Sequence, residues 1–248
     1  MNATRLFRVA VGAFILFVPA VLLAAQKESK DVAAIRQTLE SRYPKMKILD
    51  VTPAPIPSLY EVFTGGAIYY TDKSGNYLIS GSLVDTRSKK DLTEDRVNER
   101  NAISFGSLPF DQAIKIVKGS GTRKLAVFTD PDCPYCRRLE EELKTVTDTT
   151  VYVFLFPLKQ IHPNAEAHAK AIWCSNDRAE AWSQWMLEKK EPQATACAAD
   201  PVNTVLELGE KLHVSGTPTL YFENGSRSAG AMSAKDLETR LVEAKKAS

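Results

Sequence analysis

The chain has 248 residues, of which 44% are hydrophobic, and its 32 basic and 30 acidic side chains leave a formal charge of +2. This near balance gives no support to a nucleic-acid partner or to any strongly charged partner. About 220 residues remain behind the N-terminal segment, enough for one large domain or two small ones with buried cores.

The first 25 residues have the pattern of a secretory signal peptide. Arg5 and Arg8 give a positively charged start, and residues 9–25 are apolar apart from one glycine and Pro19. Because this run is short for a membrane span and is interrupted by Pro19, cleavage at its end is favoured over a retained anchor. No later segment is long and apolar enough to cross a membrane. We therefore expect export to an oxidising compartment, where disulfides persist.

Residues 26–88 have the pattern of a small α+β unit. Residues 31–43 carry apolar side chains at helical spacing and end before Pro44. A unit of roughly sixty residues is marginal as a lone monomer, which favours pairing with a second copy. Strand-like runs follow the helix, with a hairpin-turn signal before the last of them, at residues 48–52, 59–64, 67–71 and 77–84.

Residues 89–107 form a charged connection. The segment from Arg87 to Arg100 has few apolar anchors beyond Leu92 and Val97. A helix this polar is typical of a solvent-bridging connection between domains rather than of an element packed into a core. The sequence therefore predicts a helical linker.

Residues 108–248 have an α/β pattern. Strands, helices and a hairpin alternate, and the last helix begins at Ser233 with Asp236 as a capping-box partner. We expect strands at 124–129 and 151–156, helices around 165–173, 182–186 and 202–212, and a hairpin at 219–231.

The stretch Cys133-Pro134-Tyr135-Cys136 lies between the strand at 124–129 and the start of a helical pattern. Unpaired N–H groups and the helix dipole favour an anion at a helix start, so Cys133 is expected to be an exposed, ionised thiolate. Thiols so placed have pKa values of roughly 3.5–7.5. Cys136, one turn further on, can attack a mixed disulfide at Cys133 and release the substrate. The pair predicts a redox centre.

Two other interpretations of this pair are weaker. A zinc site needs two more ligands at short spacing, whereas Cys174 and Cys197 are distant and have no such spacing. A purely structural Cys133–Cys136 disulfide is disfavoured because a two-residue loop strains the bond and makes it reducible. We expect no metal and no cofactor.

The three histidines give no catalytic signal. His162, His168 and His213 show no metal-ligand spacing and no nearby catalytic partner, so we expect surface or packing roles. Residues 140–142, all glutamate, are expected on the solvated face of the helix that follows Cys133. Residues 214–219 contain Gly216-Thr217-Pro218 just before a predicted strand, where a cis bond is possible but a trans turn is favoured by the residues alone.

Residues 128–136 together with Gly216-Thr217-Pro218 resemble the thioredoxin-fold disulfide oxidoreductases. Ala171-Ile172-Trp173-Cys174 with a partner at Cys197, the N-terminal α+β unit and the charged connection are similar to the DsbC/DsbG family of periplasmic thiol:disulfide interchange proteins. The resemblance covers nearly the whole chain after the signal peptide. It implies a thioredoxin-like α/β catalytic domain preceded by a small α+β, cystatin-like dimerisation domain and a helical linker.

The resemblance also implies roles for single residues. Pro218 is expected to be cis and to face the redox pair, and Thr217 to lie beside the sulfurs. Cys174 and Cys197 are expected to form a structural disulfide. The chain is then a periplasmic homodimer with no nucleic-acid partner.

The function implied is rearrangement of incorrect disulfides in exported proteins, with a DsbD-like membrane reductase as the electron donor. Pro134-Tyr135 matches the dipeptide of DsbG-like members, whereas Cys174 and Cys197 match DsbC-like members better. A DsbG-like reductase that protects single cysteines therefore stays open as an alternative. So does an exported holdase chaperone or adhesion module that uses its cysteines only structurally.

Overall fold

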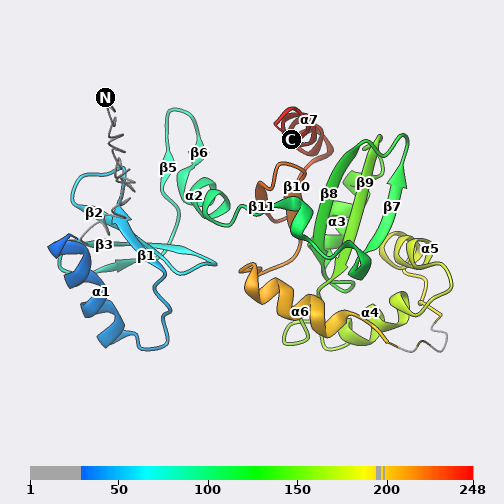
Figure 1. The fold of residues 1–248 in the computed structure, drawn as a ribbon, viewed down its shortest axis with the longest axis horizontal. Helices are drawn as coiled ribbons and strands as arrows, with labels where there is room; N and C mark the ends of the chain where they lie inside the picture. The colour runs from blue at the N-terminus through cyan, green and yellow to red at the C-terminus, as the bar shows by residue number, and fades with distance from the viewer. Residues whose placement is uncertain (1–28, 194–196, 198, 248) are drawn as a thin grey trace, which may run out of the picture.

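The structure, a computed structural model, describes residues 29–193, 197 and 199–247. The described chain forms an N-terminal lobe and a larger C-terminal lobe with helix α2 between them (Figure 1). The predicted signal peptide lies outside the described residues. Within the described ranges, no helix combines the length and the apolar character needed to span a bilayer.

The N-terminal lobe packs one helix on a four-stranded antiparallel sheet. Helix α1 begins after Ser29, whose hydroxyl accepts the Val32 N–H, and it ends before Pro44. Its apolar stripe contributes Ile35 and Leu39 to a small core. The elements are α1 (Lys30–Arg42), β1 (Asp50–Pro53), β2 (Leu59–Phe63), β3 (Ile68–Asp72) and β4 (Leu78–Ile79), and the sheet order is β1-β2-β3-β4.

The strand expected at 77–84 is wrong over its second half. The chain leaves β4 near Gly81, which has a φ of +153° that an L side chain rarely adopts. It then forms a separate hairpin of β5 (Val84–Asp85) and β6 (Lys90–Asp91). Strand β4 is thus left as a short edge of the sheet.

Helix α2 (Leu92–Arg100) is more firmly packed than its polar sequence suggests. Arg100 lies 2.7 Å from Asp50, and Arg96 lies 3.4 Å from the buried Glu61. Val97 packs against an apolar cluster on the same sheet. The expectation of a helix bridging the domains through solvent is therefore wrong for this face, because arginine side chains reach across to carboxylates of the sheet.

The C-terminal lobe is built on a five-stranded sheet of order β11-β10-β8-β9-β7, in which β8 and β9 are parallel and the other pairs antiparallel. Strand β7 had not been expected from the sequence, because it is only five residues long and includes Lys115 and Lys118. The strands are β7 (Ile114–Lys118), β8 (Arg123–Thr129), β9 (Thr149–Leu155), β10 (Thr219–Phe222) and β11 (Arg227–Ala229).

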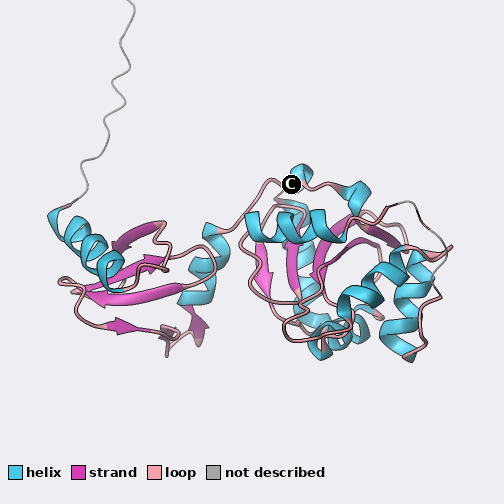
Figure 2. Cartoon of the chain, turned by 90° about the horizontal axis from the view of Figure 1, so that it is seen from below, coloured by secondary structure: helices cyan, strands magenta, loops and turns pink. Residues whose placement is uncertain are grey.

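Helices cover both faces of this sheet (Figure 2). Along β8, Leu125 and Val127 point to one core, shared with α3 and α7, whereas Ala126 and Phe128 point to a second core, shared with α6. This arrangement confirms the thioredoxin-like α/β domain after a small α+β domain. The helices are α3 (Pro134–Leu143), α4 (Ala165–Trp173), α5 (Arg178–Ser183), α6 (Val202–Lys211) and α7 (Ala234–Lys246), with short 3₁₀ helices η1 (Phe105–Ser107) and η2 (Phe110–Gln112) and a π-helix η3 (Gln184–Glu188).

The two lobes touch through the segment that follows α2. The Asn101 side-chain amide donates to the Gly65 carbonyl at 2.7 Å, and the Ile103 N–H donates to the Gly225 carbonyl at 3.0 Å. Gly65, with a φ of +90°, lies directly against the ring of His213, where a Cβ would clash. The N-terminal lobe therefore contacts the loop that leads to Pro218.

Candidate active site

The predicted redox centre lies where β8 passes into α3. Cys133 is the N-cap residue of α3, in extended conformation, and Pro134 occupies the first turn, where its missing N–H costs no hydrogen bond. The Cys133 N–H donates to the Asp130 carbonyl at 3.2 Å, which closes the turn before the helix. Pro134 and Tyr135 are exposed beside the two cysteines.

Cys133 is buried, with 5% of its surface exposed, so the expectation of an exposed thiol is wrong. Its sulfur lies 3.5 Å from the Thr217 carbonyl oxygen. The pKa of Cys133 is lowered to about 5, first by a hydrogen bond from the Cys136 thiol and further by the N–H groups of Cys136 and Tyr135 and by Thr217, while burial opposes this. Hydrogen bonds to the thiolate therefore outweigh the cost of burying it.

Cys136 has the opposite environment. It is fully buried, and burial raises its pKa far above the ordinary range, with a further rise from its hydrogen bond to Cys133. The two free cysteines thus differ in ionisation, Cys133 as the thiolate and Cys136 as the thiol at neutral pH. One sulfur therefore carries a negative charge and the other holds a proton.

The loop before β10 closes one side of the redox pair. The Thr217–Pro218 peptide bond is cis, as the family resemblance implied and contrary to what the residues alone favoured. Thr217 presents its carbonyl oxygen to the Cys133 sulfur, 84 residues away in the chain. The structure thus brings Cys133, Cys136, Thr217 and the Pro218 peptide together.

Two histidines lie at this site, so the expectation that they have no catalytic neighbour is wrong. The Nδ1 of His162 lies 3.0 Å from Asp130, whose carboxylate is completely buried, and the Nδ1 of His168 lies 2.7 Å from Asp132. Sequence spacing could not reveal these pairs, because 32 and 36 residues separate the partners. The sequence feature that could have indicated polar partners here was the pair Asp130 and Asp132, just before Cys133.

Trp185 adds a third anchor for the turn before Cys133. Its indole N–H donates to the Pro131 carbonyl at 2.7 Å, and its ring lies 4.3 Å from that of His168. Arg137 of α3 donates to the Trp185 carbonyl at 2.9 Å. Trp185 therefore packs in the core and also holds residues 130–133, called here the redox turn.

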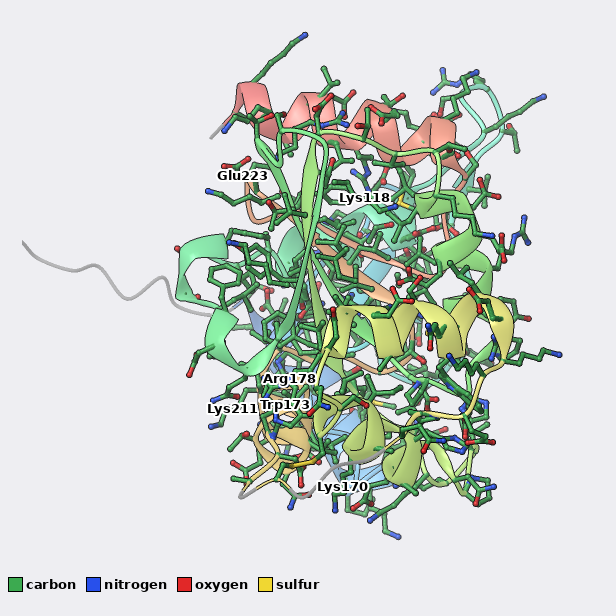
Figure 3. The ribbon with its side chains drawn as sticks, turned by 90° about the vertical axis from the view of Figure 1, so that its right-hand side faces the viewer. Lys118, Lys170, Trp173, Arg178, Lys211 and Glu223 are labelled. Carbon is green, nitrogen blue, oxygen red and sulfur yellow. A yellow bond between two sulfur atoms is a disulfide. The ribbon has the colours of Figure 1, made fainter. Side chains whose placement is uncertain are left out.

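Cys174 and Cys197 are joined in a disulfide, with Cα atoms 5.4 Å apart. The bond links the end of α4 to the segment before α6. Arg178 stacks on Trp173 next to this bridge, with its guanidinium carbon 3.7 Å from the ring centroid (Figure 3). Among the described residues, no cluster of three or more Cys, His, Asp or Glu could hold a metal ion.

A strand that runs into a CxxC turn, a helix that begins at the first cysteine and a cis-proline loop against its sulfur together define a thioredoxin-fold thiol:disulfide oxidoreductase. A family model described as a thioredoxin-like domain matches residues 110–245. Another, described as the N-terminal domain of disulfide bond isomerase proteins, matches residues 24–94.

Individual relatives agree. The probable thiol:disulfide interchange protein DsbC of Bordetella avium is 40% identical over 209 residues, covering 84% of this chain and 74% of that protein. DsbC of Escherichia coli K12 is 31% identical over 220 residues, covering 87% and 89%. A crystal structure of a disulfide interchange protein from Neisseria gonorrhoeae matches with a TM-score of 0.54 and 43% identity, covering 56% of this chain and 99% of that one.

The chain belongs to the DsbC family of thiol:disulfide interchange proteins. It is therefore a disulfide isomerase of the thioredoxin fold, as the resemblance implied. The comparisons favour neither the DsbG-like reductase nor the holdase alternative.

Proposed function

We propose that Cys133 is the attacking nucleophile and Cys136 the resolving thiol of this isomerase. The Cys133 thiolate attacks an incorrect disulfide of an exported protein and forms a mixed disulfide, releasing one substrate thiolate. In isomerisation that thiolate attacks another disulfide of the substrate, and the thiolate released there attacks the mixed disulfide and frees the Cys133 thiolate. In resolution Cys136 attacks the Cys133 sulfur, its proton goes to the departing substrate sulfur, and a Cys133–Cys136 disulfide remains. The observation that carries this assignment is the position of the two cysteines: Cys133 is the N-cap residue of α3 and keeps some exposed surface, whereas Cys136 lies within the helix and has none.

Pro134, Tyr135, Thr217 and Pro218 complete the proposed site. Tyr135 is 63% exposed and Pro134 is also at the surface, so both can meet a substrate chain that reaches the buried sulfur. The Thr217 carbonyl oxygen lies 3.5 Å from the Cys133 sulfur and can accept a hydrogen bond from its thiol form. We assign these four residues to substrate contact and to tuning of the thiolate, and the Cys174–Cys197 bridge to structure.

The domain division that we propose has a signal peptide at 1–25, a dimerisation domain at 26–88, a helical linker at 89–107 and a catalytic domain at 108–248. The open edge of the N-terminal sheet supports the homodimer. Strand β4 has two residues and no neighbour on its outer side within the described chain, and Tyr77 and Ile79 expose 75% and 50% of their surface there. A second copy that covers these exposed apolar side chains would remove them from water.

The proposed compartment is the periplasm, and the proposed electron donor is a DsbD-like membrane reductase. Isomerisation consumes no electrons, but each resolution by Cys136 leaves an oxidised enzyme that must be reduced before the next attack. The N-terminal sequence pattern supports export, and a donor anchored in the membrane can supply electrons across it.

A trapping experiment tests the roles of the two cysteines. In Cys136→Ala, mixed disulfides between Cys133 and a scrambled multi-disulfide substrate should accumulate, because nothing resolves them. In Cys133→Ala few should form, because the remaining thiol is buried and protonated. Non-reducing electrophoresis of alkylated samples measures both. Accumulation in Cys133→Ala instead would reverse the assignment.

A further inference from the structure

Asp130 ties the redox turn to the loop that follows β9. Its carboxylate, with no exposed surface, accepts the Asp132 N–H at 2.7 Å and the Leu158 N–H at 2.6 Å. Its third partner is the Nδ1 of His162 at 3.0 Å. A buried carboxylate is costly unless it is hydrogen-bonded and its charge is compensated. The imidazole of His162 can carry the positive charge that compensates Asp130.

The position of Asp130 is coupled to that of Cys133. The Asp132 N–H, one residue before Cys133, is held by the Asp130 carboxylate, and the Cys133 N–H is held by the Asp130 carbonyl. The Asp130 N–H lies 3.4 Å from the Cys136 sulfur. A change at the His162–Asp130 contact therefore reaches both cysteines through backbone hydrogen bonds.

The charges around His162 come from several elements. Asp130 directly follows β8, Asp132 lies in the turn, and the Cys133 thiolate lies at the start of α3. The pKa of His162 is raised, first by its hydrogen bond to Asp130 and then by the charges of Asp130, Cys133 and Asp132, while burial opposes this. Two neighbouring basic side chains have other partners, since the Nδ1 of His168 in α4 lies 2.7 Å from Asp132 and Lys159 of the same loop pairs with Glu166 at 3.0 Å.

We propose that His162 is a positioning residue of the redox centre, whose imidazolium holds Asp130 and favours the thiolate form of Cys133. The inference rests on the proposed role of Cys133 as the nucleophile. The side chain of His162 is 20% exposed, so it exchanges protons with solvent while it contacts a fully buried carboxylate. As pH rises through the pKa of His162, the hydrogen bond to Asp130 remains available but the positive charge near Cys133 is lost.

The first test is the thiolate pKa of Cys133 in reduced His162→Asn. Asparagine keeps an N–H donor for Asp130 and removes the charge, so the Cys133 pKa should rise by about 0.5–1 unit. Lys159→Gln is the matched control, because it removes a positive charge from the same loop but from a partner outside the turn. Its thiolate pKa should equal that of the parent protein. Ultraviolet thiolate absorbance against pH measures all three proteins.

An unchanged Cys133 pKa in His162→Asn overturns the inference, and so does an equal rise in Lys159→Gln. An ordinary thiol pKa in the parent protein contradicts the proposed function itself. The two failures are therefore distinguishable.

A second measurement leaves His162 in place, so it holds even if His162→Asn folds poorly. Coupling between two titrating groups is reciprocal, so removing the Cys133 thiolate must lower the pKa of His162 by a similar amount. Nuclear magnetic resonance titration of the imidazole in the reduced parent and in Cys133→Ala should show this decrease. An identical His162 pKa in both proteins would show that His162 and Cys133 are not coupled, and it would contradict the proposal.

Discussion

At the scale of single residues, the chemistry depends on two sulfurs with opposite surroundings. Cys133 receives hydrogen bonds from the Cys136 thiol and from N–H groups at the start of α3, whereas Cys136 has no exposed surface. The Cys136 thiol and the unpaired N–H groups of the helix N-terminus account for the first environment, and burial accounts for the second. Neither cysteine would have these properties at the other position.

The pH dependence of alkylation follows from these pKa values. Since the thiolate reacts and the pKa of Cys133 is lowered to about 5, the rate with iodoacetamide should be flat at neutral pH and fall as pH drops through about 5. In Cys136→Ala the midpoint should move up, because the first cause of the low pKa is the hydrogen bond from Cys136. Stopped-flow alkylation of both reduced proteins measures the midpoints, and equal midpoints would remove Cys136 from the explanation.

Glu140 illustrates how residue surroundings depend on neighbouring elements. It was expected on the solvated face of α3, but it is half-buried, and burial raises its pKa to about 7 against the lowering effects of Trp182 and Lys118. Those two residues come from α5 and β7. The helix pattern alone could not place them opposite Glu140.

At the scale of elements, the bridge between Cys174 and Cys197 connects α4 to the segment that precedes α6. It closes a loop with a sequence separation of 23 residues. In the chain-entropy description a cross-link of this length limits the unfolded ensemble and stabilises the fold by about 3 kcal/mol. The redox turn lies between β8 and α3, so the bridge and the active cysteines lie in different parts of the domain.

Replacing both bridge cysteines by alanine should therefore lower the free energy of unfolding by about 3 kcal/mol and leave insulin reduction active. Urea denaturation of the reduced-active-site protein, beside an insulin assay, measures both effects. The matched control is the Cys133→Ala, Cys136→Ala double variant, which should lose insulin reduction without this loss of stability. Equal stability of the bridge variant and the parent would contradict the structural role.

At the scale of the whole molecule, two lobes are joined by contacts that set how the catalytic lobe is presented. Arg96 and Arg100 fix α2 to the N-terminal sheet, and Asn101 and Ile103 continue to the C-terminal lobe. A dimer formed through the N-terminal sheet would therefore hold two redox sites on connections anchored at both ends. Two sites that share one substrate can rearrange its disulfides before it leaves, whereas a single site releases the substrate too early.

Ile79→Lys tests this link between assembly and function. A charged side chain on the open β4 edge should disfavour pairing and shift the protein to a monomer at micromolar concentration. Insulin reduction should persist because the redox site is local, whereas refolding of a scrambled substrate should fall several-fold. Val242→Lys, at an exposed apolar residue of α7, is the control and should change neither property. A variant that sediments as a dimer, or a monomer with full isomerase activity, would contradict the proposal.

The sequence by itself determined the features that depend on neighbours a few residues apart. The position of Cys133 at a helix start, the Ser233 cap of α7 and the turn before β4 were all predicted, because caps and turns are encoded within four or five residues. The succession of a small α+β unit and an α/β unit was expected for the same reason, because each strand and helix has its own hydrophobic period.

Only the tertiary structure decided what the redox turn touches. His162, His168 and Trp185 reach Asp130, Asp132 and Pro131 across 32 to 54 residues of chain. The same holds for the packing of α2 and for the burial of Cys133. These contacts depend on how β9, α4 and η3 pack around α3, and packing is a property of the whole domain rather than of any local segment. The spacing of residues in the sequence does not encode this packing.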